Sequence, residues 1–150
     1  MPQSLHLLAV HMIFSTKHRH PVLNEEIQPK LYAYMAGILR KMECYSITIG
    51  GIEDHVHIAC HLTKKHAPIK VLEELKKDSS KWLKTQSAAF GGFHWQDGYG
   101  LFSVSPSHFD ALRKYVMNQK KHHKKESFQE ELIRILKKYD VEYDEKYLWD

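Results

Sequence analysis

The stretch Tyr45-Ser46-Ile47-Thr48-Ile49-Gly50-Gly51-Ile52-Glu53-Asp54-His55-Val56-His57-Ile58-Ala59-Cys60-His61-Leu62 decides the fold of this chain. It opens with a run rich in β-branched residues, which favour strands, and that run ends at two glycines. Extended structure resumes over 56–62, so the two segments are expected to pair as a hairpin. Because side chains two apart in a strand point the same way, His55 and His57 share one face, which we expect to be open, while Val56 faces the core.

Hydrophobic spacing predicts the elements on either side of this hairpin. We expect further strands over 5–14 and 101–104, and helices over 25–42, from Pro68 to just before Gly91-Gly92, from Ser107 to about His123, and after Ser127. Ser107 with Asp110, and Ser127 with Glu130, have the spacing of helix capping boxes. The order β-α-β-β-α-β-α-α predicts an α+β sandwich of ferredoxin-like or RRM-like type, a central antiparallel sheet with helices packed mainly on one face.

Size and composition indicate one globular domain that spans residues 1–150. The chain has a mass of 17.7 kDa, with 43% hydrophobic and 27% charged residues, which is ordinary for a soluble protein. No apolar run approaches the roughly 20 residues of a membrane helix, and the first residues lack the layout of a secretory signal. We therefore expect no association with a membrane. Two cysteines make no disulfide framework, so we expect reduced thiols and a cytoplasmic location.

Charge is distributed unevenly around the net value of +4. Six Lys/Arg and no acid lie between Arg113 and Lys125, whereas eight acids and four bases lie between Glu126 and Asp150. This segregation indicates either an anionic partner near Tyr115 or a lysine-rich solvated helix end, and charge alone does not separate the two. If the partner is a nucleic acid, the candidate contacts are Lys17, Arg19, Arg113, Lys114, Lys120, Lys121, His122 and His123.

The histidine pair in the strand is a candidate metal site. With 12 histidines in the chain, chance gives roughly one His-x-His, and the sequence holds two. The pair His18 and His20 lies in a polar loop, where it is a chance occurrence or a phosphate contact. For His55 and His57, spacing alone supports metal ligands and half-buried strand histidines about equally.

Tyr115 and Gln119 are four residues apart and therefore share one face of the predicted helix. A tyrosine in this setting is usually a core-edge residue. A neutral phenol, with a pKa of about 10, is a poor nucleophile. To attack, it would need a phosphate polarised by a metal, nearby cations or a base. The chain has candidate metal ligands, cationic side chains and candidate bases, so it can in principle supply all three.

Taken together, these motifs resemble the HUH-type single-tyrosine transposases of the insertion sequence 200/605 class, which act on single-stranded DNA. The resemblance covers nearly the whole chain. The segments that carry it are His11-Met12-Ile13-Phe14-Ser15-Thr16-Lys17, Arg19-His20-Pro21-Val22-Leu23, Gly51-Ile52-Glu53-Asp54-His55-Val56-His57, the run from Trp95 to Ser105, Tyr115-Val116-Met117-Asn118-Gln119 and His122-His123.

The resemblance implies a mechanism and a set of site residues. His55, His57 and Gln119 would bind a divalent metal, Mg²⁺ or Mn²⁺, and Tyr115 would be the catalytic nucleophile that forms a 5′-phosphotyrosine intermediate. The partners it implies are single-stranded DNA with hairpins and a second copy of the chain, with the tyrosine helix of one copy completing the site of the other. Related proteins that process repetitive extragenic palindromes share much of this pattern, so a domesticated role is an alternative.

Two further functions stay open from the residues themselves. A non-catalytic RRM-like binder would stack nucleic-acid bases on its sheet, although it would leave the strand histidines and the Tyr/Gln pair without a role. A metal-dependent hydrolase would use Tyr115 only to position water, and it would form no covalent protein–DNA product.

Overall fold

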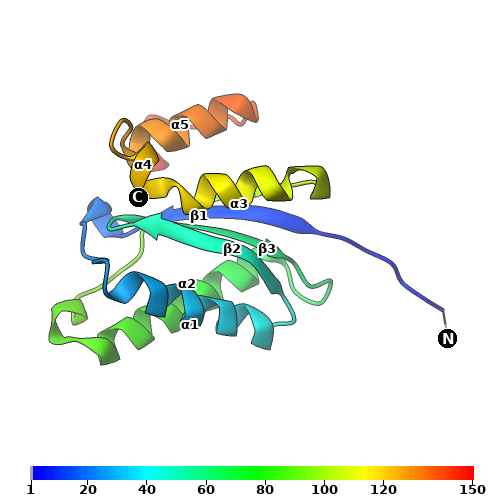
Figure 1. Ribbon diagram of the computed structural model, residues 1–150, viewed down its shortest axis with the longest axis horizontal. Helices are drawn as coiled ribbons and strands as arrows, with labels where there is room; N and C mark the ends of the chain where they lie inside the picture. The colour runs from blue at the N-terminus through cyan, green and yellow to red at the C-terminus, as the bar shows by residue number, and fades with distance from the viewer. Residues whose placement is uncertain (1) are drawn as a thin grey trace.

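The computed structural model describes residues 2–150, and a four-stranded antiparallel sheet lies at its centre (Figure 1). The spatial order of the strands is β2-β3-β1-β4. Their bounds are β1 (Ala9–Ser15), β2 (Tyr45–Ile52), β3 (His55–His61) and β4 (Gly100–Ser103). The predicted hairpin is present as β2 and β3, and the α+β class with a central antiparallel sheet is confirmed.

Helices cover both faces of this sheet. The long helices α1 and α2 lie below it in Figure 1, whereas α3, α4 and α5 lie above it. The helices are α1 (Ile27–Lys41), α2 (Pro68–Gln86), α3 (Phe109–Met117), α4 (Gln119–His122), α5 (Phe128–Lys138) and α6 (Glu145–Leu148), with short 3₁₀ turns η1 (Lys17–Arg19), η2 (Ala88–Phe90) and η3 (Pro106–His108). The expectation of helices mainly on one face therefore describes α1 and α2 but not the C-terminal helices.

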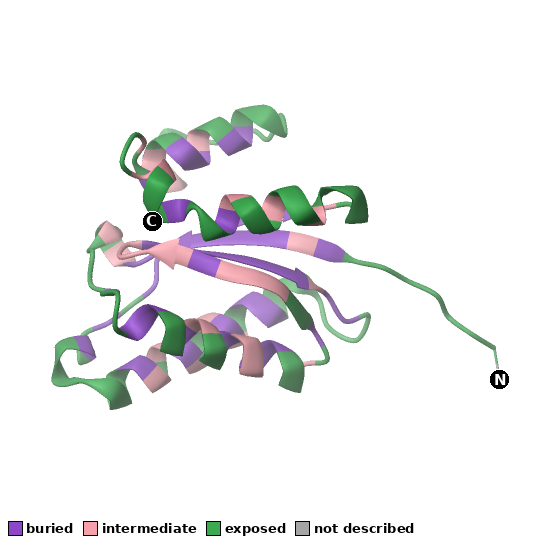
Figure 2. Ribbon diagram, in the orientation of Figure 1, coloured by how far each residue is buried: buried purple, intermediate pink, exposed green. Residues whose placement is uncertain are grey.

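The apolar residues of β1 explain the two layers. Met12 and Phe14 join the larger core with α1 and α2. Ile13 points to the opposite face, where it packs with Phe102 and with α5 residues such as Leu132. Strand β3 is buried along nearly its whole length (Figure 2). The face that carries the strand histidines is consequently covered, and our expectation of an open face was wrong.

Local signals at the helix ends were correct in one case and wrong in another. The Ser127–Glu130 capping box forms, with the Glu130 backbone N–H donating to Ser127 Oγ at 3.1 Å. The Ser107–Asp110 box does not form, because Ser107 lies in η3 and α3 begins only at Phe109. The predicted helix to His123 is interrupted at Asn118, so α3 and α4 are separate.

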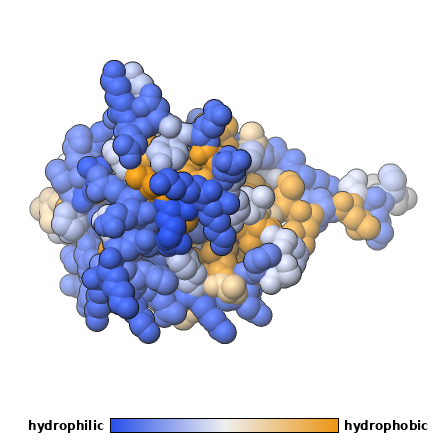
Figure 3. Space-filling model, turned by 90° about the horizontal axis from the view of Figure 1, so that it is seen from above, coloured by the Kyte–Doolittle hydropathy of each residue, from blue (hydrophilic) through white to orange (hydrophobic). Residues whose placement is uncertain are grey.

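The first strand begins at Ala9, four residues later than predicted. The preceding segment extends away from the body of the protein (Figures 1 and 3), and it exposes Leu5, Leu7 and Leu8. Elsewhere the face seen in Figure 3 is mostly hydrophilic, with apolar side chains visible between charged ones. Within residues 2–150, every helix is too short or too polar to cross a membrane.

Gly50 allows the helix that carries Tyr115 to lie close to the sheet. A Cβ atom at Gly50 would meet both Cγ1 and the backbone oxygen of Val116 at 2.9 Å. Val116 is buried and directly follows Tyr115 in α3. The contact involves backbone, so the helix itself would have to move to accept a methyl group.

We therefore expect Gly50→Ala to destabilise the protein by about 1–3 kcal/mol, the usual effect of overpacking, and to displace Tyr115. The matched control is Gly37→Ala in α1, where a Cβ would meet nothing within 4 Å. That variant should be stabilised by about 0.5–1 kcal/mol because alanine favours a helix. Urea unfolding of both variants tests the contact, and equal free energies of unfolding would contradict it.

Candidate active site and metal centre

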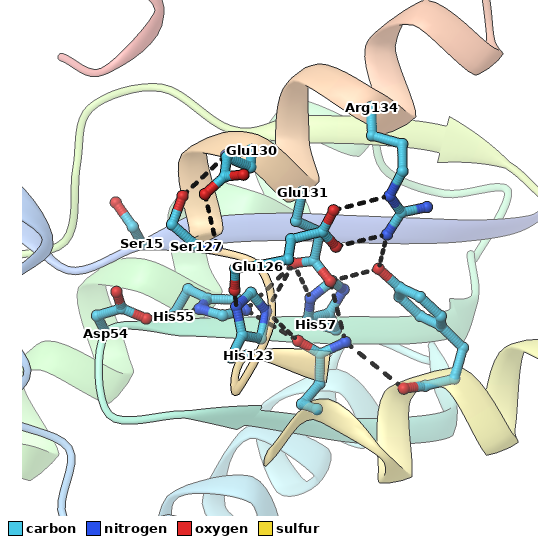
Figure 4. Close-up of polar contacts among 12 residues, drawn as sticks. Ser15, Asp54, His55, His57, His123, Glu126, Ser127, Glu130, Glu131 and Arg134 are labelled. Carbon is cyan, nitrogen blue, oxygen red and sulfur yellow. Dashed lines mark hydrogen bonds and ion pairs between the residues drawn. The ribbon is translucent and has the colours of Figure 1, made fainter. Parts of the chain in front are cut away.

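The two strand histidines meet the C-terminal helices in a buried polar cluster (Figure 4). His55 and His57 come from β3, and neither is exposed to solvent. Across the sheet, His57 lies opposite Ile13 of β1 and His55 opposite Ser15. Their rings point to the face that α5 covers, as the two-residue period of the strand requires.

Five polar side chains direct an atom to one point in this cluster. Three imidazole Nε2 atoms lie close to Glu131 Oε1, at 3.3 Å from His55, 3.0 Å from His57 and 3.2 Å from His123. Gln119 Oε1 lies 3.0 Å from Nε2 of His55 and 2.9 Å from Nε2 of His123. The three histidines and Glu131 could together hold a metal ion.

The charges of the cluster balance one another within the protein. Burial alone would raise the pKa of Glu131, but its hydrogen bonds with the three imidazoles outweigh burial and hold that pKa well below its usual range. Burial alone would lower the pKa of His55, but its hydrogen bonds with Asp54 and Glu131 raise that pKa to about 9. Burial lowers the pKa of His57. Glu131 is therefore an anion beside a protonated His55.

An outer set of hydrogen bonds orients the imidazole rings. His55 Nδ1 donates to Asp54 Oδ1 at 2.7 Å, and His123 Nδ1 donates to the backbone oxygen of Glu126 at 2.6 Å. His57 Nδ1 lies 2.7 Å from Nε2 of His11. Because every Nδ1 atom is engaged, every Nε2 atom faces the centre, as in histidines that bind metals.

His11 is an unusual partner for such a ring. It is buried, and burial together with the neighbouring His57 lowers its pKa to about 3. The two rings are stacked, with centroids 5.0 Å apart. His57 is thus oriented by a neutral imidazole, whereas His55 is oriented by a carboxylate.

Tyr115 lies at the edge of the cluster, half-buried in the last turns of α3. Its hydroxyl donates to Glu131 Oε2 and accepts from Arg134 Nη2 at 2.9 Å. Burial, with a further contribution from Glu131, raises the pKa of the phenol. The hydroxyl is therefore a neutral group held between an anion and a cation.

The structure brings together all four residues of the predicted site. His55, His57 and Gln119 contribute to the cluster, and Tyr115 is connected to it through Glu131. Gln119 is buried, and its amide nitrogen donates to Glu131 Oε2 at 3.2 Å.

The candidate DNA contacts are more scattered. Lys121 and His122 line a hollow of about 540 Å³ beside Tyr115. His123 lies in the cluster with His55, His57 and Glu131 and is nearly buried. The remaining ones lie apart or pair with acids: Lys17 with Asp97, Arg113 with Asp110, Lys120 with Glu25, Arg19 over the ring of Trp149, and Lys114 exposed on α3.

Sequence reasoning missed His11, Glu131 and Arg134, and it assigned His123 to DNA contact rather than to the histidine cluster. One signal for Glu131 was available. It is three residues from Phe128 and four from Ile135, so an acid lies on the apolar face of α5. A carboxylate on such a face needs a buried partner, and the strand histidines were the available ones.

Comparison with known proteins assigns the chain to a family. The family model described as "Transposase IS200 like" matches residues 4–119. The ISDra2 transposase TnpA of Deinococcus radiodurans is 27% identical over 117 residues, which are 75% of this chain and 84% of that protein.

Two solved structures share the fold. A crystal structure assigned as a transposase of Deinococcus radiodurans has a TM-score of 0.62 and 24% identity, and the match covers 79% of this chain and 98% of that one. A REP-associated tyrosine transposase bound to a REP hairpin has a TM-score of 0.58 and 12% identity, with 82% and 74% covered. Since the family model matches well over half of the sequence, the chain belongs to the IS200-like transposase family.

Proposed function

We propose that this transposase cleaves and rejoins single-stranded DNA with Tyr115 as the nucleophile and a divalent cation at the histidine cluster. One observation carries the proposal. The Tyr115 hydroxyl is bonded to Glu131, and Glu131 contacts three imidazole nitrogens that converge on one point.

The donor set fits a cation. Ligand atoms about 2.1 Å from one ion lie about 3.0–3.4 Å apart. The Oε1 atoms of Glu131 and Gln119 lie 2.9 to 3.3 Å from the imidazole nitrogens that they contact, and the ligand atoms of the three histidines and Glu131 all lie within 4.8 Å of one another. His55, His57 and Gln119 are the proposed ligands, and His123 and Glu131 complete the set. Imidazole nitrogens suit transition metals such as Zn²⁺, whereas the Glu131 carboxylate and the Gln119 amide oxygen are the kind of oxygen donors that Mg²⁺ and Mn²⁺ prefer. A bound cation would supply Lewis-acid polarisation of a phosphate oxygen.

The residues around the phenol support a transesterification. Tyr115 Oη would form a bond to phosphorus as the bond from phosphorus to the 3′ oxygen breaks, which leaves a 5′-phosphotyrosine and a free 3′-hydroxyl. Glu131 Oε2 already accepts the phenolic hydrogen. Lys121 and Lys125 line the hollow beside Tyr115, where they would hold the DNA backbone. By analogy with the relative bound to a REP hairpin, we propose strands that carry hairpins as substrates.

Tyr115→Phe should abolish the covalent protein–DNA product. The measurement is a denaturing gel with labelled hairpin-bearing single strands and Mn²⁺. Wild type should give a slow band that EDTA prevents, and the matched control Tyr45→Phe, an exposed tyrosine of β2, should give it too. Cleavage without a band, persisting in Tyr115→Phe, would indicate a hydrolase. Binding of every strand without cleavage would favour the RRM-like binder.

We also propose that each chain holds a complete active site, even if two copies associate as the resemblance implies. The rings of Tyr115 and His57 of one chain have centroids only 5.8 Å apart. The Tyr115 hydroxyl also reaches Glu131 of the same chain. No second chain is needed to join the nucleophile to the cluster.

If sites are complete within one chain, mixing Tyr115→Phe with His55→Ala should give no more covalent product than the separate variants. The product is measured on the same denaturing gel over a range of protein concentrations. Recovery of a substantial fraction of wild-type product on mixing would establish exchange of the tyrosine helix between two copies.

His11 should control metal affinity through His57. When His57 binds a cation through Nε2, its proton resides on Nδ1 and needs an acceptor, which His11 Nε2 provides. His11→Met removes that acceptor and should weaken Mn²⁺ binding by about 10–100-fold. His11→Gln places an amide oxygen near the Nε2 position and should retain most of the affinity. Calorimetric titration with Mn²⁺ decides, and equal affinities of the two variants would contradict the role of His11.

A further inference from the structure

Helix α5 lies beyond the part of the chain that the family model matches, which ends at residue 119. It is nevertheless fixed over the site. Its capping box closes the N-terminal end, and Phe128, Leu132 and Ile135 pack on the second face of the sheet. Side chains on α5 therefore have defined positions relative to Tyr115.

Arg134 of α5 touches the atom that would attack phosphorus. Its Nη2 donates to Tyr115 Oη at 2.9 Å. Glu126 holds the guanidinium by accepting from Nε at 3.1 Å and from Nη2 at 2.9 Å. Within residues 2–150, Nη1 has no hydrogen bond in the structure. Roughly half of the Arg134 side chain is exposed, so a phosphate can reach it.

The position of this contact also suits a strand of DNA. Tyr115 and Arg134 together line two hollows of about 510 and 540 Å³. Lys121 and Lys125 line the larger hollow. Apolar side chains together with Ser103 and Ser105 line the other one. A strand that passes from one hollow to the other brings a phosphate over the phenol and the guanidinium.

We propose that Arg134 is a catalytic residue of the transesterification, which binds the phenolic oxygen and a non-bridging oxygen of the scissile phosphate. The inference rests on the proposed function. In the step, Tyr115 Oη bonds to phosphorus, and the 3′ oxygen leaves with the electron pair of the broken bond. The phenol loses a proton and the 3′ oxygen gains one, so no net charge is created. Arg134 is always a cation and can share charge that moves across the phosphate.

The alternative is a purely structural role, in which Arg134 only forms an ion pair with Glu126 at the surface. Exposed pairs of this kind contribute little to stability, and their loss would not change a reaction rate. Under this alternative, losing the contact between Arg134 and Tyr115 Oη would have no effect on catalysis. Under the proposal, losing it slows formation of the covalent product.

The test is the single-turnover rate of covalent product formation with a hairpin-bearing single strand and Mn²⁺. Arg134→Ala should lower the rate constant by about 10²–10³-fold, the usual effect of losing one donor to a developing charge. Binding of the strand, measured by fluorescence anisotropy in EDTA, should change by less than about tenfold. Added guanidinium should restore part of the rate, and Arg134→Lys, which lacks the planar fork, should be intermediate.

The matched control is Lys137→Ala, which removes one positive charge from the exposed side of the same helix. Its rate should equal that of wild type. A wild-type rate in Arg134→Ala, or a slow rate that guanidinium leaves unchanged, would overturn the inference. If thermal unfolding shows that Arg134→Ala is destabilised, Arg134→Lys decides instead, and a wild-type rate in that variant would overturn the inference. If wild type itself forms no covalent product, the proposed function fails, independently of Arg134.

Discussion

The buried ion pair between Glu131 and His55 is the constraint on which the C-terminal half of the structure depends. Both side chains are without solvent exposure, and a buried charge is costly unless it is paired and hydrogen-bonded. Glu131 meets that requirement only because α5 lies over β3, where three imidazoles and Tyr115 surround the carboxylate. The same polar contacts therefore fix both the position of α5 and the geometry of the site, and they do so together with the apolar packing of the helix.

Much of the fold could be predicted from the sequence because the signals are local. Alternation over a few residues identifies the hairpin, and it places His55 and His57 on one face of a strand. The capping box at Ser127 likewise needs only four consecutive residues. What local patterns could not predict is that the histidine face is covered, because the covering residues, such as Leu132, follow more than seventy positions later.

The site was predicted in part for the same reason. Tyr115 and Gln119 are related by helical spacing, which can be read from the sequence. Glu131 lies in the first turn of a helix, where acids are common, so its signal in the sequence was its place on the apolar face of α5. His123 follows α4, which is separated from α3 by the break at Asn118, and both helices pack against β2. Residues whose role depends on such a tertiary turn have no short-range signature.

The proposed site residues fall on both sides of the point where the matched family segment ends. The proposed nucleophile and the proposed ligands His55, His57 and Gln119 lie within residues 4–119, whereas His123, Glu131 and Arg134 lie beyond them. The shared segment thus holds the minimum needed for the proposed chemistry. The residues beyond 119 change that minimum in two ways. They add an imidazole and a carboxylate to the candidate donor set, and they place Glu131 and Arg134 against the phenol. Tyr115 is half-buried where Arg134 reaches it, and an electrostatic interaction is stronger there than between fully exposed groups. A helix beyond the matched segment can therefore alter the reactivity of a residue within that segment.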